Sequence, residues 1–396
     1  LDGAELSTTT ASRGAIGDVI IKASERVTVQ GVGTPNPEDR FRRSSITAEF
    51  FGRGSGSSGS IRITTPVLEV LNGAQLNVNT NRGSAGTIQI LASDRVTFRG
   101  TGTVGNSVVS SNAQSAVTEG GTNLSSGGNL EINTPVLEVL DGARLLVSTF
   151  AQGNAGDIRI TADRMVVRGV SPEGLNSLVL STVDPRGRGN GGNIEINASI
   201  LEVRGGAEIA VSTEGRGNAG SLVIGGQRPS DRVVLTNRGS LSARSTSEGA
   251  AGNLTVNSRD LILRNNSTIT ATNQASQGGN IRLGNSSRLL IDDSEISAST
   301  QTGQAGSLRL NAREIQIENS GRLAVEAIAG GTAGSLNIRT AQLGLQNRGQ
   351  ISVSSRARGA AGSLEITAQQ IDQQSLSHHC RNRSGCRRRY GAANCR

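Results

Sequence analysis

The chain has 396 residues, of which 53 are glycine, 34% are hydrophobic and only 2% are aromatic. No run reaches the ~18 apolar residues of a spanning helix, and glycine is not at every third position, which excludes a helical membrane protein and a collagen. The formal net charge is +8, but residues 373–396 alone carry six arginines and no acid. The rest of the chain is close to neutral, which argues against nucleic acid as a partner.

An internal repeat dominates the sequence. The element Gly-x-h-x-h, in which h is an aliphatic residue, occurs twelve times, and most successive copies start 27 or 28 residues apart. The copies begin at Gly17, Gly59, Gly86, Gly128, Gly156, Gly192, Gly220, Gly252, Gly279, Gly306, Gly334 and Gly362. A fixed period of this length indicates tandem supersecondary units.

Within each unit the aliphatic residues form three pairs with a period of two. In the unit from Gly306 these pairs are Leu308/Leu310, Ile315/Ile317 and Leu323/Val325. A period of two is typical of a strand with one buried face, and the Gly, Asn, Ser and Asp residues between the pairs favour turns. We therefore expect an all-β solenoid of about 12–13 coils, with three short strands per coil, each pairing with its equivalent in the next coil.

Two features of the unit predict how the coils stack. The repeat glycine is expected where the backbone turns with a positive φ. Asn193, Asn253 and Asn280 directly follow repeat glycines and are expected to form side-chain amide ladders. An antiparallel sandwich would also have short strands, but it would not keep a constant period, so the solenoid is favoured for residues 1–372.

Some units are longer than 28 residues because they carry insertions, and the longest of these units lie in the N-terminal half of the chain. Three units are lengthened after their second aliphatic pair, at residues 31–43, 100–106 and 169–176. The coils from Gly252 to Gly362 keep the minimal length. Alternate coils should therefore project loops at one corner, which in solenoids is often the binding face. Sequence drift in a solvated corner is the other interpretation.

The first of these loops contains the candidate ligand contacts Arg40, Phe41, Arg42 and Arg43. Phe41 would serve as an apolar anchor, and the three guanidinium groups would bind carboxylate or sulfate groups. If the protein adheres to a surface, we expect the contact at this ridge of loops.

The third strand of each coil has a polar row. Ser297/Ser299, Thr270/Thr272 and equivalent pairs should point to solvent by alternation, while Arg244 and Glu326 interrupt the row. This row is interpreted as a hydroxyl-rich face that keeps the rod soluble. An adhesive face and an ice-binding face are the alternatives.

The sequence offers little for catalysis or metal binding. Residues 1–372 contain no His and no Cys, which removes the usual base, nucleophile and soft metal ligands. Asp292, Asp293 and Glu295 form the only dense acidic cluster and are expected in a solvated turn. We therefore predict no catalytic residues, no cofactor and no metal.

The C-terminal segment 373–396 differs from everything before it. It contains every His, Cys and Tyr of the chain, among them His378, His379 and Cys380. A zinc site, a basic tether and out-of-frame translation are the interpretations, and the last is preferred. In each case we expect the segment to be disordered. Because the chain opens in the middle of a repeat, we expect it to be a fragment or a processed chain.

Several phrases recur in a fixed order and carry a resemblance to a known family. They include Asp141-Gly-Ala-Arg-Leu-Leu-Val-Ser-Thr, Gly153-Asn-Ala-Gly-Asp-Ile-Arg-Ile and Gly217-Asn-Ala-Gly-Ser-Leu-Val-Ile. These phrases resemble the repeat region of filamentous-haemagglutinin-like exoproteins, especially the cyanobacterial branch. The resemblance covers about residues 1–372.

The resemblance implies a right-handed parallel β-helix that is exported by two-partner secretion. It further implies a non-catalytic structural adhesin at the cell surface or in the extracellular space, associated with the outer membrane. The implied partners are the outer-membrane two-partner-secretion transporter and surface glycans or extracellular polysaccharide. Because β-helices also host polysaccharide lyases and glycosidases, a carbohydrate-active enzyme is the alternative function.

Overall fold

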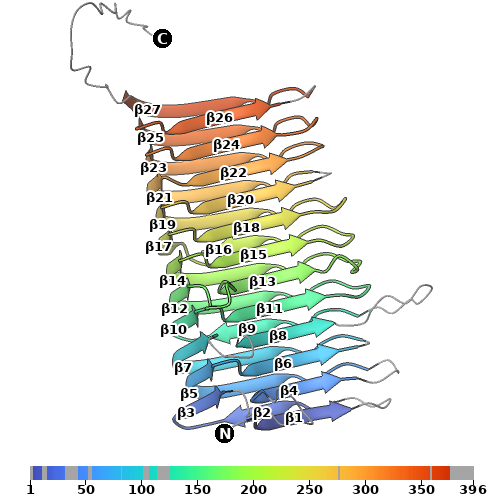
Figure 1. The fold of residues 1–396 in the computed structure, drawn as a ribbon. Helices are drawn as coiled ribbons and strands as arrows, with labels where there is room; N and C mark the ends of the chain where they lie inside the picture. Colours follow the sequence, from blue (N-terminus) through green and yellow to red (C-terminus); the bar gives the residue numbers. More distant parts are fainter. Residues whose placement is uncertain are drawn as a thin grey trace, which may run out of the picture.

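The structure is a computed structural model that describes residues 3–10, 16–31, 43–51, 56–81, 83–100, 107–113, 125–274, 277–356 and 359–374. Over these ranges the chain forms 27 strands, stacked in order along a rod from β1 to β27 (Figure 1). The described part of the chain contains no helix, and so none that could cross a membrane. Arg40, Phe41, Arg42 and residues 375–396 lie outside the described residues.

The strands belong to two parallel sheets. Sheet A is 12-stranded and consists of β1 (Glu5–Thr10), β4 (Ser45–Phe50), β6 (Gln75–Thr80), β8 (Val108–Ala113), β11 (Arg144–Thr149), β13 (Leu178–Val183), β15 (Glu208–Thr213), β18 (Ser240–Ser245), β20 (Thr268–Asn273), β22 (Glu295–Thr300), β24 (Arg322–Ala327) and β26 (Gln350–Ser355).

Sheet B is 15-stranded and contains the first two aliphatic pairs of each repeat. Its strands are β2 (Val19–Lys22), β3 (Arg26–Gln30), β5 (Ile61–Leu71), β7 (Ile88–Arg99), β9 (Leu130–Asn133), β10 (Val136–Leu140), β12 (Ile158–Arg168), β14 (Ile194–Arg204), β16 (Leu222–Ile224), β17 (Ser230–Thr236), β19 (Leu254–Arg264), β21 (Ile281–Asp292), β23 (Leu308–Glu318), β25 (Leu336–Gln346) and β27 (Leu364–Gln374).

Every strand pairs in parallel with its equivalent in the next coil. In sheet B, for example, Leu254 pairs with Ile281, Ile281 with Leu308, and Leu308 with Leu336. Like residues therefore stack along the rod, and the predicted parallel β-helix is confirmed. Sheet A, which holds the third pair of each repeat, stacks in the same way.

The structure refines the expected division of each coil into three strands. In most coils the first two pairs lie in one long strand that continues through a bend, and between β19 and β21 the pairing register shifts at this bend. In β19, Ser258 is buried, while Arg259 and Asp260 that follow it are both outside the core, so the inside–outside alternation reverses there. We call this bend corner 1. The two pairs form separate strands only at β2/β3, β9/β10 and β16/β17 among the described coils.

The other two turns of a coil complete the frame. Corner 2 joins a sheet B strand to the following sheet A strand, and corner 3 returns from sheet A to sheet B and contains the repeat glycine. The interior between the sheets is filled by stacked Ile, Leu, Val and Ala side chains. Leu308, from the first aliphatic pair of its unit, and Ile338, from the first pair of the next unit, are both 0% exposed.

The repeat glycines have a different role from the one predicted. None of the twelve has a positive φ, so the expectation of a left-handed turn residue is wrong. Instead, each glycine from Gly59 to Gly362 lies against the carbonyl oxygen of the repeat glycine one coil before it. A Cβ on Gly306, for example, would lie within 3.0 Å of Gly279 O. Glycine is needed because two coils approach closely at this corner.

The amide ladders predicted beside these glycines are present. Asn280 Nδ2 donates to Asn253 Oδ1 at 3.1 Å, and the backbone N–H of Ser307 donates to Asn280 Oδ1 at 2.9 Å. Asn193 accepts in the same way from Ser221 N at 2.9 Å. Each amide oxygen thus receives a backbone N–H from the next coil, which ties consecutive coils together at corner 3.

Candidate functional site

The three predicted insertions leave the rod at the same corner. Strands β3, β7 and β12 each end where an inserted segment begins, and β4, β8 and β13 each begin where it ends, so all three segments connect a sheet B strand to a sheet A strand, as corner 2 does. Residues 32–42 and 101–106 themselves lie outside the described residues. Arg43 lies at the base of the first loop and is partly buried. With Arg40, Phe41 and Arg42 outside the described residues, ligand contact at this loop stays a prediction.

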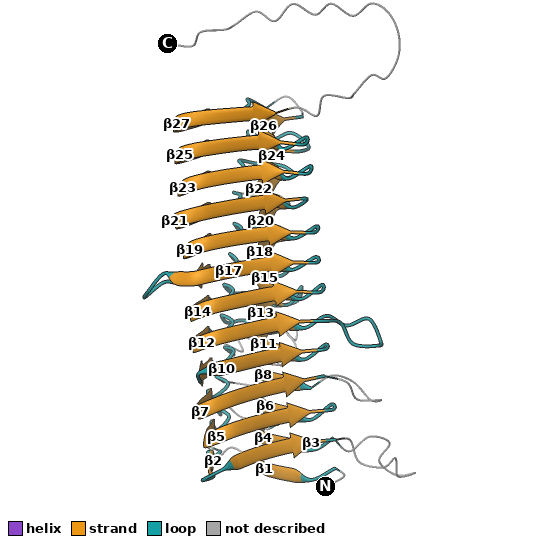
Figure 2. Cartoon of the chain, turned by 90° about the vertical axis from the view of Figure 1, so that its left-hand side faces the viewer, coloured by secondary structure: helices purple, strands orange, loops and turns teal. Residues whose placement is uncertain are grey.

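The loop at residues 169–176 is described and has defined internal geometry. Ser171 N donates to Leu175 O at 2.8 Å, Gly174 N donates to Ser171 O at 2.9 Å, and Val170 bridges Asn176. Val170 and Leu175 remain 43% and 40% exposed. The loop projects beyond the end of β12 (Figure 2). It therefore presents two aliphatic side chains on a hydrogen-bonded turn.

A buried serine closes the base of each of these loops. Ser44, Ser107 and Ser177 are 3%, 1% and 0% exposed. Their hydroxyl groups donate to the last carbonyl of the preceding strand, on Gln30, Arg99 and Arg168, at 2.9, 2.6 and 2.7 Å. Our sequence reasoning missed these residues. The available signal was a serine directly before the aliphatic third strand in each lengthened coil.

The same serine contact closes a turn that carries no loop. Ser267 Oγ donates to Arg264 O at 2.7 Å across the short turn Asn265–Asn266. The base of a long loop therefore resembles an ordinary turn, and the length of the loop does not disturb the coil. This is the arrangement expected of a scaffold that displays exchangeable loops.

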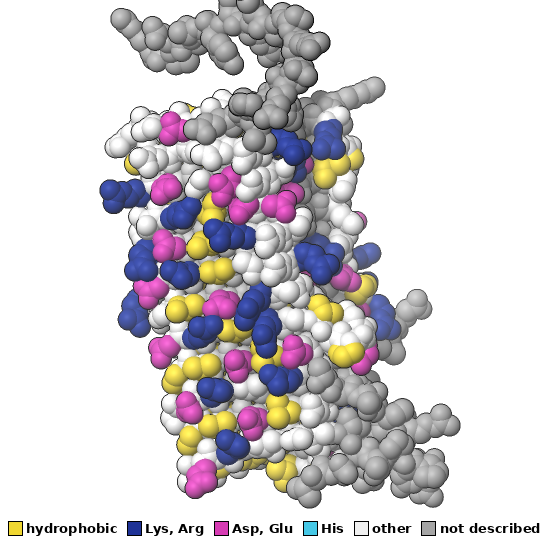
Figure 3. Space-filling view, turned by 60° about the vertical axis from the view of Figure 1, so that its left-hand side comes forward, with side chains coloured by type: hydrophobic (Ala, Val, Ile, Leu, Met, Phe, Trp, Pro, Cys, Tyr) yellow, Lys and Arg dark blue, Asp and Glu magenta, His cyan; other side chains and the backbone are white. Residues whose placement is uncertain are grey.

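The outer face of sheet B is charged and balanced. Basic and acidic side chains alternate along it, with hydrophobic side chains between them (Figure 3). Ion pairs join neighbouring coils, such as Arg164–Glu202 at 2.7 Å and Arg264–Asp292 at 3.6 Å. With their arginines about half exposed, each pair contributes only about 0.2–1 kcal/mol. The balance agrees with the near-neutral charge predicted for this part of the chain.

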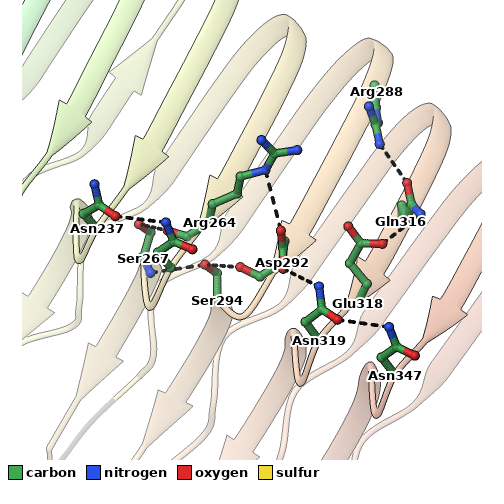
Figure 4. Close-up of polar contacts among 11 residues, drawn as sticks. Asn237, Arg264, Ser267, Arg288, Asp292, Ser294, Gln316, Glu318, Asn319 and Asn347 are labelled. Carbon is green, nitrogen blue, oxygen red and sulfur yellow. Dashed lines mark hydrogen bonds and ion pairs between the residues drawn. The ribbon is translucent and has the colours of Figure 1, made fainter. Parts of the chain in front are cut away.

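The acidic cluster belongs to a row of side-chain contacts that joins successive coils at corner 2, which we call the corner 2 ladder. Asp292 accepts from Asn319 Nδ2 at 2.8 Å and pairs with Arg264, and Asn319 accepts in turn from Asn347 at 3.0 Å (Figure 4). Glu295 pairs with Arg322 at 3.2 Å. The three acids lie in or beside a turn, as predicted, but their carboxylates bind neighbouring coils. No group of three or more His, Cys, Asp or Glu residues that could hold a metal occurs among the residues that the structure describes.

The polar row on sheet A faces outward but is less exposed than predicted. Ser297 is 5% exposed and Asn79 is 6% exposed. Side chains at the same position in adjacent coils lie close enough to cover one another and to bond, as Ser212 Oγ does to Thr182 Oγ1 at 2.7 Å. The row therefore contributes hydrogen bonds between coils.

One carboxyl group on this face has a perturbed environment. Burial raises the pKa of Glu49, the nearby Glu5 raises it further, and a hydrogen bond from Asn79 Nδ2 at 2.6 Å opposes the shift. Burial also lowers the pKa of the Arg144 guanidinium on β11.

No protein-family model, curated protein or solved structure matches this chain.

Proposed function

We propose that this chain is the β-helix rod of a secreted or surface-displayed exoprotein of the filamentous-haemagglutinin type, and that it serves as a non-catalytic, adhesin-like structural element. The observation that carries the proposal is that the flanking strands assign all three lengthened segments to corner 2, where the described loop 169–176 projects from the rod. A rod whose interior is filled by stacked aliphatic side chains offers a rigid base for such loops.

The loop at 169–176 supplies the chemistry for contact. Val170 and Leu175 would bury their remaining exposed apolar surface against a partner, and because each is only about 40% exposed, this contributes about 1 kcal/mol per side chain. In this proposal the arginines around Phe41 add anion contacts, and the partners are surface glycans or extracellular polysaccharide. Export through an outer-membrane two-partner-secretion transporter, and an extracellular or cell-surface location, belong to the same proposal and rest on the family resemblance.

The test is to shorten the described loop and measure adhesion. Replacing Gly169–Asn176 by Asn-Asn copies the short turn Asn265–Asn266 and keeps the closing Ser177. We expect the variant to keep its circular dichroism spectrum. Retention on cells or polysaccharide-coated surfaces should fall about fivefold or more, which corresponds to about 1 kcal/mol.

A matched variant distinguishes lost contacts from lost length. Val170→Ser with Leu175→Ser keeps the loop but removes its exposed aliphatic surface, and it should lose a comparable part of the retention. Measuring at two salt concentrations separates apolar from ionic contact, because salt screens exposed charges. Unchanged retention by a folded, shortened variant would reject this loop as the adhesive contact.

A further inference from the structure

A second feature of the surface is a hollow of about 400 Å³ at corner 1. It is lined by residues of four successive coils, at 133–135, 161–163, 197–199, and 227–229 with 231. Its floor is made of small side chains at the bend of three successive coils. Thr134, Ala162 and Ala198 are 1%, 8% and 3% exposed.

A short insertion builds one wall of the hollow. Ile224 and Ser230 pair with Val256 and Ser258 of the next coil, so residues 225–229 stand where β19 has Asn257 alone. The insertion projects from the rod beside β17 (Figure 2). The unit from Gly220 is longer than its neighbours for this reason, but sequence reasoning did not identify it as a site.

The wall is held in place by hydrogen bonds to the preceding coil. Gly225 N donates to Ile196 O at 2.9 Å, and Gln227 N donates to Asn197 Oδ1 at 3.0 Å. The Asn197 amide is itself oriented, because its Nδ2 donates to Glu195 Oε1 at 2.9 Å. Pro229 further restricts the backbone of the insertion. A wall fixed before binding lowers the entropic cost of binding.

The polar groups of the hollow are arranged in columns along the rod. Asn133, Thr161 and Asn197 stack in register as amide, hydroxyl and amide. Successive coils are about 4.8 Å apart, which is comparable to the length of one pyranose residue. On the other side of the bend lie Asp163 and Asp231, both exposed.

We propose that this hollow binds a short stretch of a neutral glycan. Carboxylate, amide and hydroxyl groups at sugar-length spacing can accept and donate hydrogen bonds to the hydroxyl groups of consecutive sugar residues. The lining holds Asp163, Asp231 and Arg228, and Arg259 pairs with Asp231 at 4.0 Å, so these groups give no excess of positive charge to attract an acidic glycan or a nucleic acid. The absence of aromatic side chains from the lining predicts weak binding, at about millimolar Kd. The site is independent of the corner 2 loops and does not require that the chain mediate adhesion.

The test uses the full chain and soluble neutral tetrasaccharides, namely β-1,4-linked glucose, xylose and mannose and α-1,4-linked glucose. Binding is measured by calorimetry and by ligand-observed NMR. The variant that replaces residues 225–229 by one Asn restores the continuous strand of β19 and removes the wall. Asp163→Ala leaves the wall intact and removes one carboxylate.

We expect at least one tetrasaccharide to bind the parent chain, about tenfold weaker binding by the wall-deleted variant, and weaker binding by Asp163→Ala. Tetragalacturonate and a DNA oligonucleotide should bind less well than the neutral sugar. Failure of every neutral tetrasaccharide to bind, equal binding by the wall-deleted variant, or stronger binding of the anions would overturn the proposal. The corner 2 experiment measures retention on surfaces, and the corner 1 experiment measures binding of soluble sugars with different variants. Either proposal can therefore fail while the other holds.

Discussion

The close approach of coils at the repeat glycines yields a sharp prediction. In the Gly306→Ala variant the new Cβ would meet Gly279 O, Gly279 C and Gly278 O within 3.0 Å. These are backbone atoms and cannot rotate away, so the two coils must separate locally. The displacement would stretch the ladder hydrogen bonds between these two coils, such as Ile281 N to Ser307 O at 2.9 Å.

Two contributions set the expected loss of unfolding free energy in Gly306→Ala. Overpacking in a tight interior costs about 1–3 kcal/mol. Each weakened backbone hydrogen bond adds up to about 1 kcal/mol. We therefore expect Gly306→Ala to lower the free energy of unfolding by roughly 2–4 kcal/mol, seen as a lower urea midpoint in far-ultraviolet circular dichroism.

Gly344→Ala is the matched control. Gly344 lies within a sheet B strand and also lacks a positive φ, but its nearest neighbour to a new Cβ is Gln316 Cγ at 3.8 Å, an ordinary contact. Because alanine restricts the unfolded chain, this variant should be unchanged or more stable by about 0.4–1 kcal/mol. Equal midpoints for the two variants would refute the close-approach explanation.

The remaining predictions concern the core, the corner 2 ladder and Glu49. Leu308→Asp should cost several kcal/mol because it buries an unpaired charge, whereas Ser299→Asn on the outer face, which adds no charge beside Glu326 of the next coil, should be nearly neutral; equal urea midpoints would show that the inside–outside assignment is wrong. Asn319→Gly keeps the positive-φ turn but loses the ladder, whereas Asn319→Ala loses both, so thermal unfolding should rank the parent above the glycine variant and the glycine above the alanine variant. Because the pKa of Glu49 is raised in the folded state, ionisation destabilises the fold as the pH rises above the ordinary value of 4.5. Glu49→Gln should therefore melt at a higher temperature than the parent at pH 7, with the difference vanishing below pH 4.5, and a pH-independent difference would contradict the assignment.

The sequence predicts the scaffold well because the scaffold is repetitive. A period of two defines which side chains face inward, and the constant unit length defines which residues stack. Both hold from Leu254 to Leu336, and the lengthened coils do share corner 2. These features depend on local pattern alone.

What the sequence did not reveal depends on contacts between coils. The period of two does not say whether a chain bends or breaks, so the continuity of β19 through Ser258 was not foreseen. The sequence does not distinguish a glycine needed for the close approach of two coils from a glycine needed for a positive φ. The prediction of a positive φ at Gly306 is wrong for this reason. The corner 1 hollow needs residues 225–229 together with three earlier coils, which no single repeat contains.

If this rod binds surfaces without transforming them, as proposed, a single incubation can show both properties. The full chain is mixed with neutral and acidic polysaccharides, and bound protein and new reducing or unsaturated ends are measured on the same samples. The proposed binding role predicts saturable binding with no new ends above a protein-free control. Sustained formation of new ends in proportion to the protein added would contradict it and would identify a carbohydrate-active enzyme.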